Sequence, residues 1–215
     1  MTNAAVVASS RASVMQAVRS AVAGRTPGEP FTVQELLTEG SRAAVDQAMT
    51  RLARSGEVER VTRGVYAVPR VNATLGRRVP VSPEAAAEAI ARSAGAVLSV
   101  HGAEAARRFG LTTQVPLTSV LTTTGRSRRV VVGGREVRLM HASSRRMALA
   151  GRPAGEALAA LLYLGRSEVT TDVIAQVRRR LAPEEFEALR EAVTAMPAWL
   201  TDLLHLAVPR ELAIA

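Results

Sequence analysis

The chain has 215 residues and is 47% hydrophobic, which is enough for one large or two modest cores. It contains no cysteine, so disulfides, cysteine-bound zinc and thiol chemistry are excluded. The formal net charge is +9, and all 28 basic residues are arginine.

The positive charge is unevenly distributed along the chain. Residues 1–80 hold 11 arginines and 6 acidic residues (+5), and residues 81–150 hold 10 and 4 (+6). Residues 151–215 hold 7 and 9 (−2). A basic front with a mildly acidic tail favours a polyanionic partner for the first two thirds of the chain.

The N-terminal residues have a short apolar run with no basic segment before it, unlike a signal peptide. The longest apolar run, 157–164, is far below the ~20 residues that a membrane span requires. We therefore expect a cytoplasmic protein with no membrane partner.

Two helical segments are predicted before residue 40. Apolar residues of the segment 10–23 recur at helical spacing, and Gly24 ends it. Thr32 and Glu35 then have the spacing of a capping box, which indicates a short second helix.

A tight turn at Gly40 leads into the helix on which the main functional prediction depends. Ser41 is a suitable N-cap and Gly56 a suitable stop, so we expect a helix over 42–55. The apolar residues that would form its buried face are Val45, Ala48, Met49 and Leu52.

A two-stranded ribbon follows this helix. Segments 57–61 and 65–68 alternate in polarity around Thr62, Arg63 and Gly64, which predicts a hairpin. The order helix, turn, helix and ribbon is typical of a winged helix-turn-helix. We therefore predict a DNA-binding domain over 1–70 and a linker over 71–81.

The remaining residues, 82–215, are predicted to form a second domain. Ser82, Pro83 and Glu84 have the pattern of a helix start, and that helix should reach about residue 93. Beyond it we expect a buried strand at 96–100, a helix at 102–109, a strand at 119–124, a hairpin at 129–140 turning at Gly133-Gly134, and helices at 154–164, 171–181, 183–195 and 197–207. The predicted fold class is α+β: an N-terminal winged helix-turn-helix, then an α/β C-terminal domain with a helical tail.

The DNA-contacting residues are predicted from the outer face of the 42–55 helix and from the ribbon tip. Arg42 and Gln47 are suited to base edges, since arginine can bind guanine and glutamine adenine through paired hydrogen bonds. Arg51 and Arg54 are suited to phosphates, and an arginine at the ribbon tip can enter the minor groove. The full predicted set is Ser41, Arg42, Gln47, Thr50, Arg51, Arg54, Arg60, Thr62, Arg63, Arg77, Arg78, Arg126, Arg128 and Arg129.

The last three residues of this set lie in a separate arginine-rich segment, TTTGRSRR, at 122–129. They are interpreted as a second phosphate-contacting surface or as a site that binds an acidic patch of a toxin. A solvated hairpin loop is the alternative interpretation.

No catalytic site, metal site or cofactor is predicted. The three histidines are far apart in the sequence, and His101 is better placed to cap the helix that follows it than to bind a metal. Glu136 and Arg138 faintly resemble part of a nuclease motif, but such a site needs a lysine, and the chain has none.

Two segments together resemble a known family. The run GEVERVTRGVYAVP at 56–69 and the run HGAEAARRFGLTTQVP at 101–116 resemble AbiEi-type type IV antitoxins, in particular the DUF6088-type winged-helix regulators. The tail around Trp199 agrees with this pattern, and the resemblance extends over about 10–207.

The resemblance implies an antitoxin whose winged helix represses its own operon and whose C-terminal domain opposes a nucleotidyltransferase-like toxin. It implies double-stranded DNA of the chain's own promoter as the main partner. Two alternatives remain open: a stand-alone winged-helix regulator with a ligand- or protein-sensing C-terminal domain, and a protein-binding adaptor.

Overall fold

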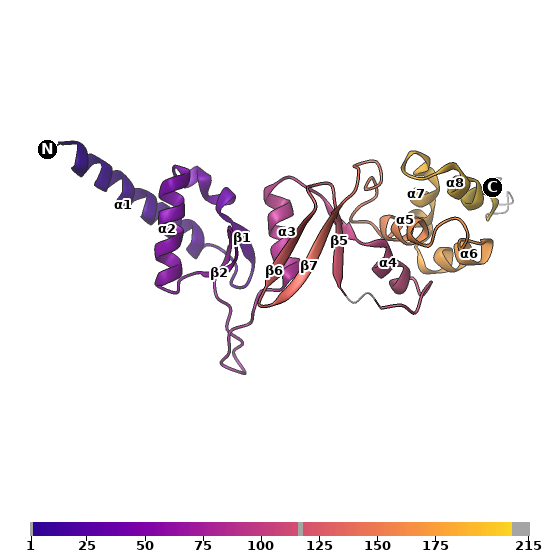
Figure 1. Ribbon diagram of the computed structural model, residues 1–215, viewed down its shortest axis with the longest axis horizontal. Coiled ribbons are helices and arrows are strands. Elements are labelled where there is room, and N and C mark those ends of the chain that lie inside the picture. The colour runs from indigo at the N-terminus through magenta and orange to yellow at the C-terminus, as the bar shows by residue number, and fades with distance from the viewer. Residues whose placement is uncertain (1, 116–117, 208–215) are drawn as a thin grey trace. The chain divides into compact units, whose positions relative to one another are not determined.

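The computed structural model describes residues 2–115 and 118–207, which form an α+β fold with two small sheets (Figure 1). One sheet has three strands in the order β1-β3-β2, and the other has four in the order β4-β5-β7-β6. The chain divides into two units, Met1–Gly95 with Arg129–Val137, and Ala96–Arg128 with Arg138–Ala215.

The first unit begins with the elements of a winged helix. In chain order they are α1 (Thr2–Ala23), β1 (Pro30–Thr32), the 3-10 helix η1 (Val33–Glu39), α2 (Arg42–Arg54), β2 (Glu59–Thr62) and β3 (Val65–Ala67). The predicted fold class is confirmed, since this order and the β1-β3-β2 sheet agree with a winged helix.

Helix α2 begins and ends where the sequence predicts. The Ser41 hydroxyl accepts a hydrogen bond from the Ala44 N–H (3.4 Å) and so caps the helix. Ser55 is the C-cap, and Gly56 follows with φ +79°, a conformation that costs glycine little. The predicted core residues of this helix are buried with α1 and η1 around Phe31 and Leu36.

Strand β1 is not predicted from the sequence. Its residues Pro30–Thr32 pair antiparallel with β3, with Phe31 opposite Tyr66. The capping box is confirmed, since the Thr32 N–H donates to Glu35 Oε1 (2.8 Å). This capping box lies at the start of the 3-10 helix η1, which connects β1 to the turn before α2.

Helix α1 starts earlier than predicted, at Thr2 instead of residue 10, and it ends at Ala23 as expected. The added residues are rich in alanine, which has the highest helix propensity, so the helix needs no apolar periodicity there.

Helix α3 (Pro83–Ser93) has the predicted boundaries and belongs to the first unit. Ser82 caps it by accepting the Ala85 N–H (3.1 Å), and its buried side is almost entirely alanine. Small side chains allow close packing on β1 and β3, where Arg92 donates to the Pro30 carbonyl (3.0 Å).

The second sheet is antiparallel where β4 (Leu98–Val100) pairs with β5 (Ser119–Thr123). β4 was expected to be buried but is half-buried over its whole length. The strands β6 (Arg128–Val132) and β7 (Arg135–His141) form the predicted hairpin. Gly133 and Gly134 have φ of +56° and +78°, as the predicted primed turn requires.

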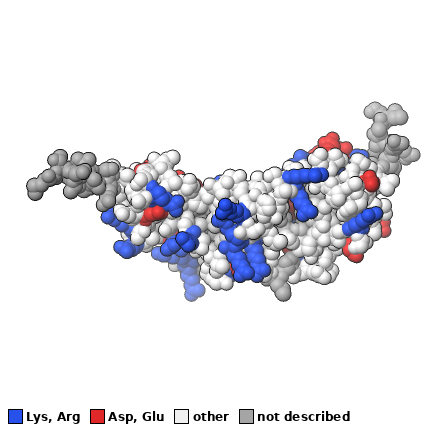
Figure 2. All heavy atoms as spheres, turned by 45° about the horizontal axis from the view of Figure 1, so that its top comes forward, with Lys and Arg blue, Asp and Glu red and all other residues white. Residues whose placement is uncertain are grey.

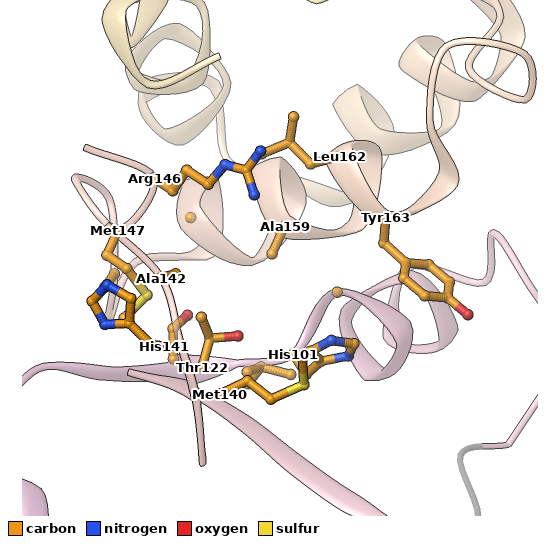
Figure 3. A pocket seen from close by; sticks show the side chains of 15 residues that line it. His101, Thr122, Met140, His141, Ala142, Arg146, Met147, Ala159, Leu162 and Tyr163 are labelled. Atoms are coloured by element: carbon orange, nitrogen blue, oxygen red, sulfur yellow. The ribbon is translucent and has the colours of Figure 1, made fainter. Parts of the chain in front are cut away.

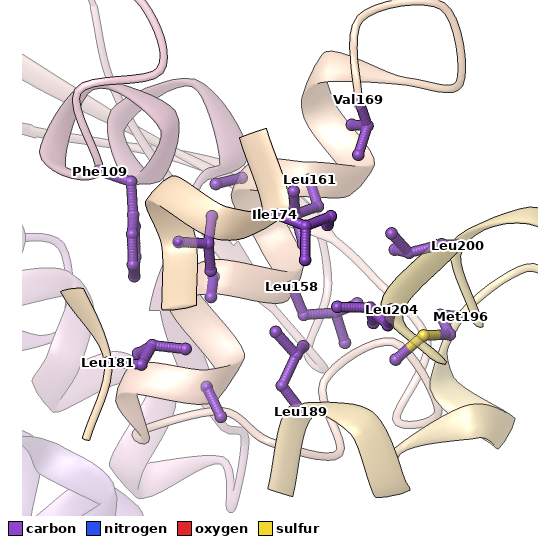
Figure 4. Close-up of a cluster of buried hydrophobic side chains, with 14 of the residues drawn as sticks. Phe109, Leu158, Leu161, Val169, Ile174, Leu181, Leu189, Met196, Leu200 and Leu204 are labelled. Atoms are coloured by element: carbon purple, nitrogen blue, oxygen red, sulfur yellow. The ribbon is translucent and has the colours of Figure 1, made fainter. Parts of the chain in front are cut away.

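Helices dominate the second unit. They are α4 (Gly102–Arg108), α5 (Pro153–Leu164), α6 (Thr171–Arg180), α7 (Pro183–Glu191), the short η2 (Val193–Ala195) and α8 (Ala198–Leu206). Figure 4 shows their apolar side chains meeting around Leu158 and Leu161 of α5, both buried. The five helices predicted in this part of the chain are confirmed, with η2 as a break after α7.

Candidate nucleic-acid interface

The exposed side of α2 carries the largest group of predicted DNA-contacting residues. Because Val45, Ala48, Met49 and Leu52 face the core, the polar residues on the opposite side of the helix face solvent. The exposed predicted residues are Ser41, Arg42, Gln47, Thr50, Arg51 and Arg54. We call this set the α2 face. Its last four members and Asp46 line one shallow depression.

Asp46 is the acidic residue within the depression, and its interactions are local. Its carboxylate lies 3.1 Å from Arg42 Nε, and its backbone carbonyl accepts the Thr50 hydroxyl (2.8 Å). The pair Arg42–Asp46 therefore offsets part of the positive charge at the start of α2. Within the described residues, Arg51 and Arg54 have no ion-pair partner, so the charge excess lies on the second half of the helix.

The wing presents two further arginines. Arg60 on β2 and Arg63 at the tip are exposed, whereas Thr62 is half-buried. The register between β2 and β3 shifts between Arg60 and Thr62, which is a β-bulge at Val61. Gly64 has φ +77° and completes the turn. Neither wing arginine forms an ion pair within the described part of the chain.

Most of the predicted linker, 71–81, forms an ordered turn that extends away from the body of the first unit (Figure 1). Val71 and Arg78 form an isolated antiparallel bridge. The Asn72 side chain accepts the N–H groups of Thr74 and Leu75 (both 2.9 Å). Arg77 and Arg78 are exposed beside the turn, as contact with a polyanion would require.

The arginines at the start of β6 are also exposed. Arg126, Arg128 and Arg129 all face solvent, which both the phosphate-binding and the solvated-loop interpretations require. On the surface that Figure 2 draws, arginine atoms are more abundant than acidic atoms.

Two ion-pair groups that the sequence did not reveal support the winged helix. Arg19 of α1 pairs with Glu57 (Nε–Oε2, 2.9 Å), which also accepts the Ser55 hydroxyl (2.8 Å). These bonds from Ser55 and Arg19 lower the pKa of Glu57 and join α1 to the end of α2. Glu57 thus remains ionised but is engaged by an arginine, which limits its repulsion of a bound phosphate.

The second ion-pair group includes Glu35 of η1. Arg25 pairs with Glu35 (3.0 Å) and stacks on the Phe31 ring, 4.2 Å from its centroid. Burial alone would raise the pKa of Glu35, but the Thr32 N–H and Arg25 outweigh it, so the pKa is lowered. The sequence signal for this group was the capping box; the arginine partner is ten residues away and has no local signature.

The structure offers no resident metal centre in the residues it describes. Over 2–115 and 118–207, no three histidine, cysteine or acidic residues are grouped closely enough to hold an ion. His101 caps α4 by accepting the Ala103 N–H (3.3 Å), as predicted. Among the same residues no helix is both long and apolar enough to cross a bilayer.

Comparisons with known proteins identify a family but no individual relative. No curated protein and no solved structure matches the chain. Residues 17–189, which include most of both units, match the family of unknown function DUF6088. Because this match covers most of its length, the chain belongs to the DUF6088 family.

Proposed function

We propose that the chain is a sequence-specific DNA-binding protein that represses its own promoter. In this proposal α2 enters the major groove, with Arg42 and Gln47 at base edges and Arg51 and Arg54 at phosphates. Arg63 of the wing contacts the adjacent minor groove. The proposal assigns no reaction and no cofactor to the chain.

The observation that carries the proposal is the exposure of Gln47, Arg51 and Arg54 on α2 without an acidic partner among the described residues. Free guanidinium groups retain their full charge and all their donors for phosphates or guanine. An arginine already paired with a carboxylate must first give up that partner. The α2 face therefore suits a polyanion better than a neutral protein surface.

A binding assay with the DNA upstream of the chain's own gene tests this function. We expect saturable binding of the full chain, with an unrelated duplex of equal length binding more weakly. If about six arginines contact phosphates, log K should fall with log salt at a slope of about −5. Arg42→Ala should reduce the preference for the promoter over the unrelated duplex. A flat salt dependence on both duplexes would contradict the proposal and favour the protein-binding adaptor.

We further propose an antitoxin role of the type IV, AbiEi-like kind, which rests on the sequence resemblance alone. In that role the predicted C-terminal domain, residues 82–215, opposes a nucleotidyltransferase-like toxin, and Arg126, Arg128 and Arg129 are candidates for binding it. Co-expression with a toxin-like neighbouring gene tests the idea: the chain should restore growth, and charge reversal of the three arginines should abolish the rescue. If the chain restores growth against none of the neighbouring gene products, the result would favour the stand-alone regulator.

A further inference from the structure

A cavity of about 240 Å³ opens within the second unit, and none of the proposed DNA-contacting residues lines it. Its walls come from the β4–α4 junction, β5, the end of β7, the segment 143–151 and α5. Figure 3 shows side chains from all sides of the cavity, with Arg146 on one side and His101 and Thr122 on the other. Its volume is below the ~300–1,000 Å³ of drug-sized sites, which favours a compact ligand.

The cavity wall is built by close packing of α4 on α5. Gly102 starts α4, and a Cβ atom there would lie 2.5 Å from Tyr163 Cβ and 2.6 Å from the Ala159 carbonyl oxygen. Only glycine allows this approach, which places His101 beside Tyr163, with the rings edge to face at 6.0 Å. His101 is therefore fixed against the wall of the cavity.

Hydrogen bonds assign one tautomer to each of the two histidines that line the cavity. Nδ1 of His101 accepts the Ala103 N–H, so the ring proton of the neutral form is on Nε2. Burial lowers the pKa of His101, which keeps the ring neutral near pH 7. Nδ1 of His141 lies 2.9 Å from the Gly125 carbonyl oxygen, which can only accept, so there the proton is on Nδ1. His101 thus offers a hydrogen-bond donor at Nε2.

The charge of the lining is positive. Arg146 is its charged residue, and no aspartate or glutamate occurs among the described residues that line the cavity. Ser99 and Thr122, which are opposite each other in the β4–β5 register, add hydroxyl groups. An anionic ligand group beside Arg146 would therefore meet a guanidinium group and no carboxylate among the described lining residues.

The rest of the lining is apolar. Met140, Met147, Ala159 and Leu162 contribute hydrocarbon and sulfur surface, and methionine adapts well to flat rings. Met140 and Tyr163 are each about half exposed, at 49% and 47%, so a ligand can enter from solvent. A pocket with apolar walls and a few convergent polar groups is the usual form of a small-molecule site.

We propose that this cavity binds a compact aromatic carboxylate that carries a polar ring substituent. Arg146 pairs with the carboxylate, and the methionines and Leu162 cover the ring. His101 Nε2–H and the Thr122 hydroxyl bind the substituent on the opposite side. This site lies wholly within the second unit and is independent of whether the first unit binds DNA.

The test is calorimetric titration of the full chain with 4-hydroxybenzoate, its methyl ester and benzoate. We expect one site per chain for 4-hydroxybenzoate. The neutral ester should bind about tenfold or more weakly, because it loses the charge-assisted bond to Arg146. Benzoate should bind severalfold more weakly, because it lacks the group that meets His101 and Thr122.

Three variants distinguish direct ligand contacts of Arg146 and His101 from the effect of removing any nearby charge. Arg146→Gln should weaken 4-hydroxybenzoate about tenfold or more and leave the ester unaffected. Arg145→Gln is the matched control, because the neighbouring Arg145 donates to the Thr194 carbonyl and does not line the cavity. His101→Asn retains a helix-capping side chain but removes the Nε2 donor, so it should weaken the hydroxylated ligand more than benzoate.

Three results would overturn the proposal. One is the absence of saturable binding by any of the three compounds to a folded chain. Another is equal binding of 4-hydroxybenzoate to wild-type protein and to a folded Arg146→Gln variant. The third is a histidine ¹⁵N spectrum that places the neutral His101 proton on Nδ1. A failure of DNA binding would leave each of these measurements unchanged.

Discussion

The arginines of the α2 face and wing differ from those at α4 and at the start of α5 in the second unit. In the second unit, Arg107 and Arg108 share Glu104, and Arg108 also reaches Glu156. Hydrogen bonds from Arg107 and Arg108 hold the pKa of Glu104 at about 2. Arg152 pairs with Glu185, which also accepts the Ala154 N–H at the start of α5 (2.9 Å).

On α2 and the wing, by contrast, only Arg42 has an acidic partner among the described residues. The difference shows that the number of arginines is a poor guide to a binding surface in a chain this basic. Arginines that join helices are already engaged, whereas unpaired ones retain their donors for a partner. We expect this contrast in pairing to correspond to a contrast in function.

The largest effect is expected from reversing two unpaired charges. Arg51→Glu with Arg54→Glu should weaken promoter binding on the order of a hundredfold, since each reversal replaces attraction to a phosphate with repulsion. Fluorescence anisotropy with labelled promoter DNA measures the change. The matched control is Arg166→Glu with Arg179→Glu, which changes the net charge equally at exposed positions of the second unit. An equal loss in both variants would show that overall charge, not the α2 face, determines binding.

A smaller loss is expected from the wing. Arg63→Ala removes a side chain that has no ion-pair partner within the described residues, so folding should be unaffected. We expect about tenfold weaker binding, and a salt slope that is less steep by about 1. A salt titration of the variant beside the wild-type chain measures both. An unchanged slope would place the wing away from DNA.

Removing the acid on the α2 face should have the opposite effect. Asp46→Asn frees Arg42 and removes a negative charge from the depression. Binding to promoter and unrelated duplexes should both become about threefold stronger, because backbone attraction is not sequence-specific. Stability should change by less than about 0.5 kcal/mol, since exposed i,i+4 pairs contribute little. Weaker promoter binding would instead assign Asp46 a role in base recognition.

The smallest effect is expected from Glu35, whose ion pair with Arg25 stabilises the winged helix. Folding lowers the pKa of Glu35, so its contribution to stability is present above the ordinary glutamate value and is lost as the pH falls through the folded value. Glu35→Gln should therefore cost about 1 kcal/mol at neutral pH. The gap between variant and wild type should close in acid, as chemical denaturation at several pH values can show. A gap that is constant with pH would contradict the role of the charge.

The sequence predicted those elements whose signals are local. Ser41 and Gly56 mark the ends of α2, Ser82 with Pro83 starts α3, and Gly133-Gly134 forms the hairpin turn. Each of these depends on a backbone group or dihedral angle within a few residues. The exposed residues of the α2 face followed from helical periodicity for the same reason.

Features that depend on distant pairing were missed. β1 is three residues long, begins with proline and exists because β3 lies beside it. The partners of Arg25 and Arg19 are ten and 38 residues away along the chain. The cavity assembles residues from 99 to 163, which are brought together only by the tertiary fold. No local pattern predicts contacts that only the complete fold creates.

The division of the chain has a practical consequence for dissecting the protein. Because the first unit takes up residues 129–137 after the chain has already entered the second, three peptide bonds link the units: after residues 95, 128 and 137. A fragment that stops at Gly95 therefore lacks nine residues of its own unit, and the complementary fragment carries them without their partners. Gene truncation is thus a poor means of separating the two activities proposed for this chain, and point substitutions in the intact polypeptide are the appropriate tool.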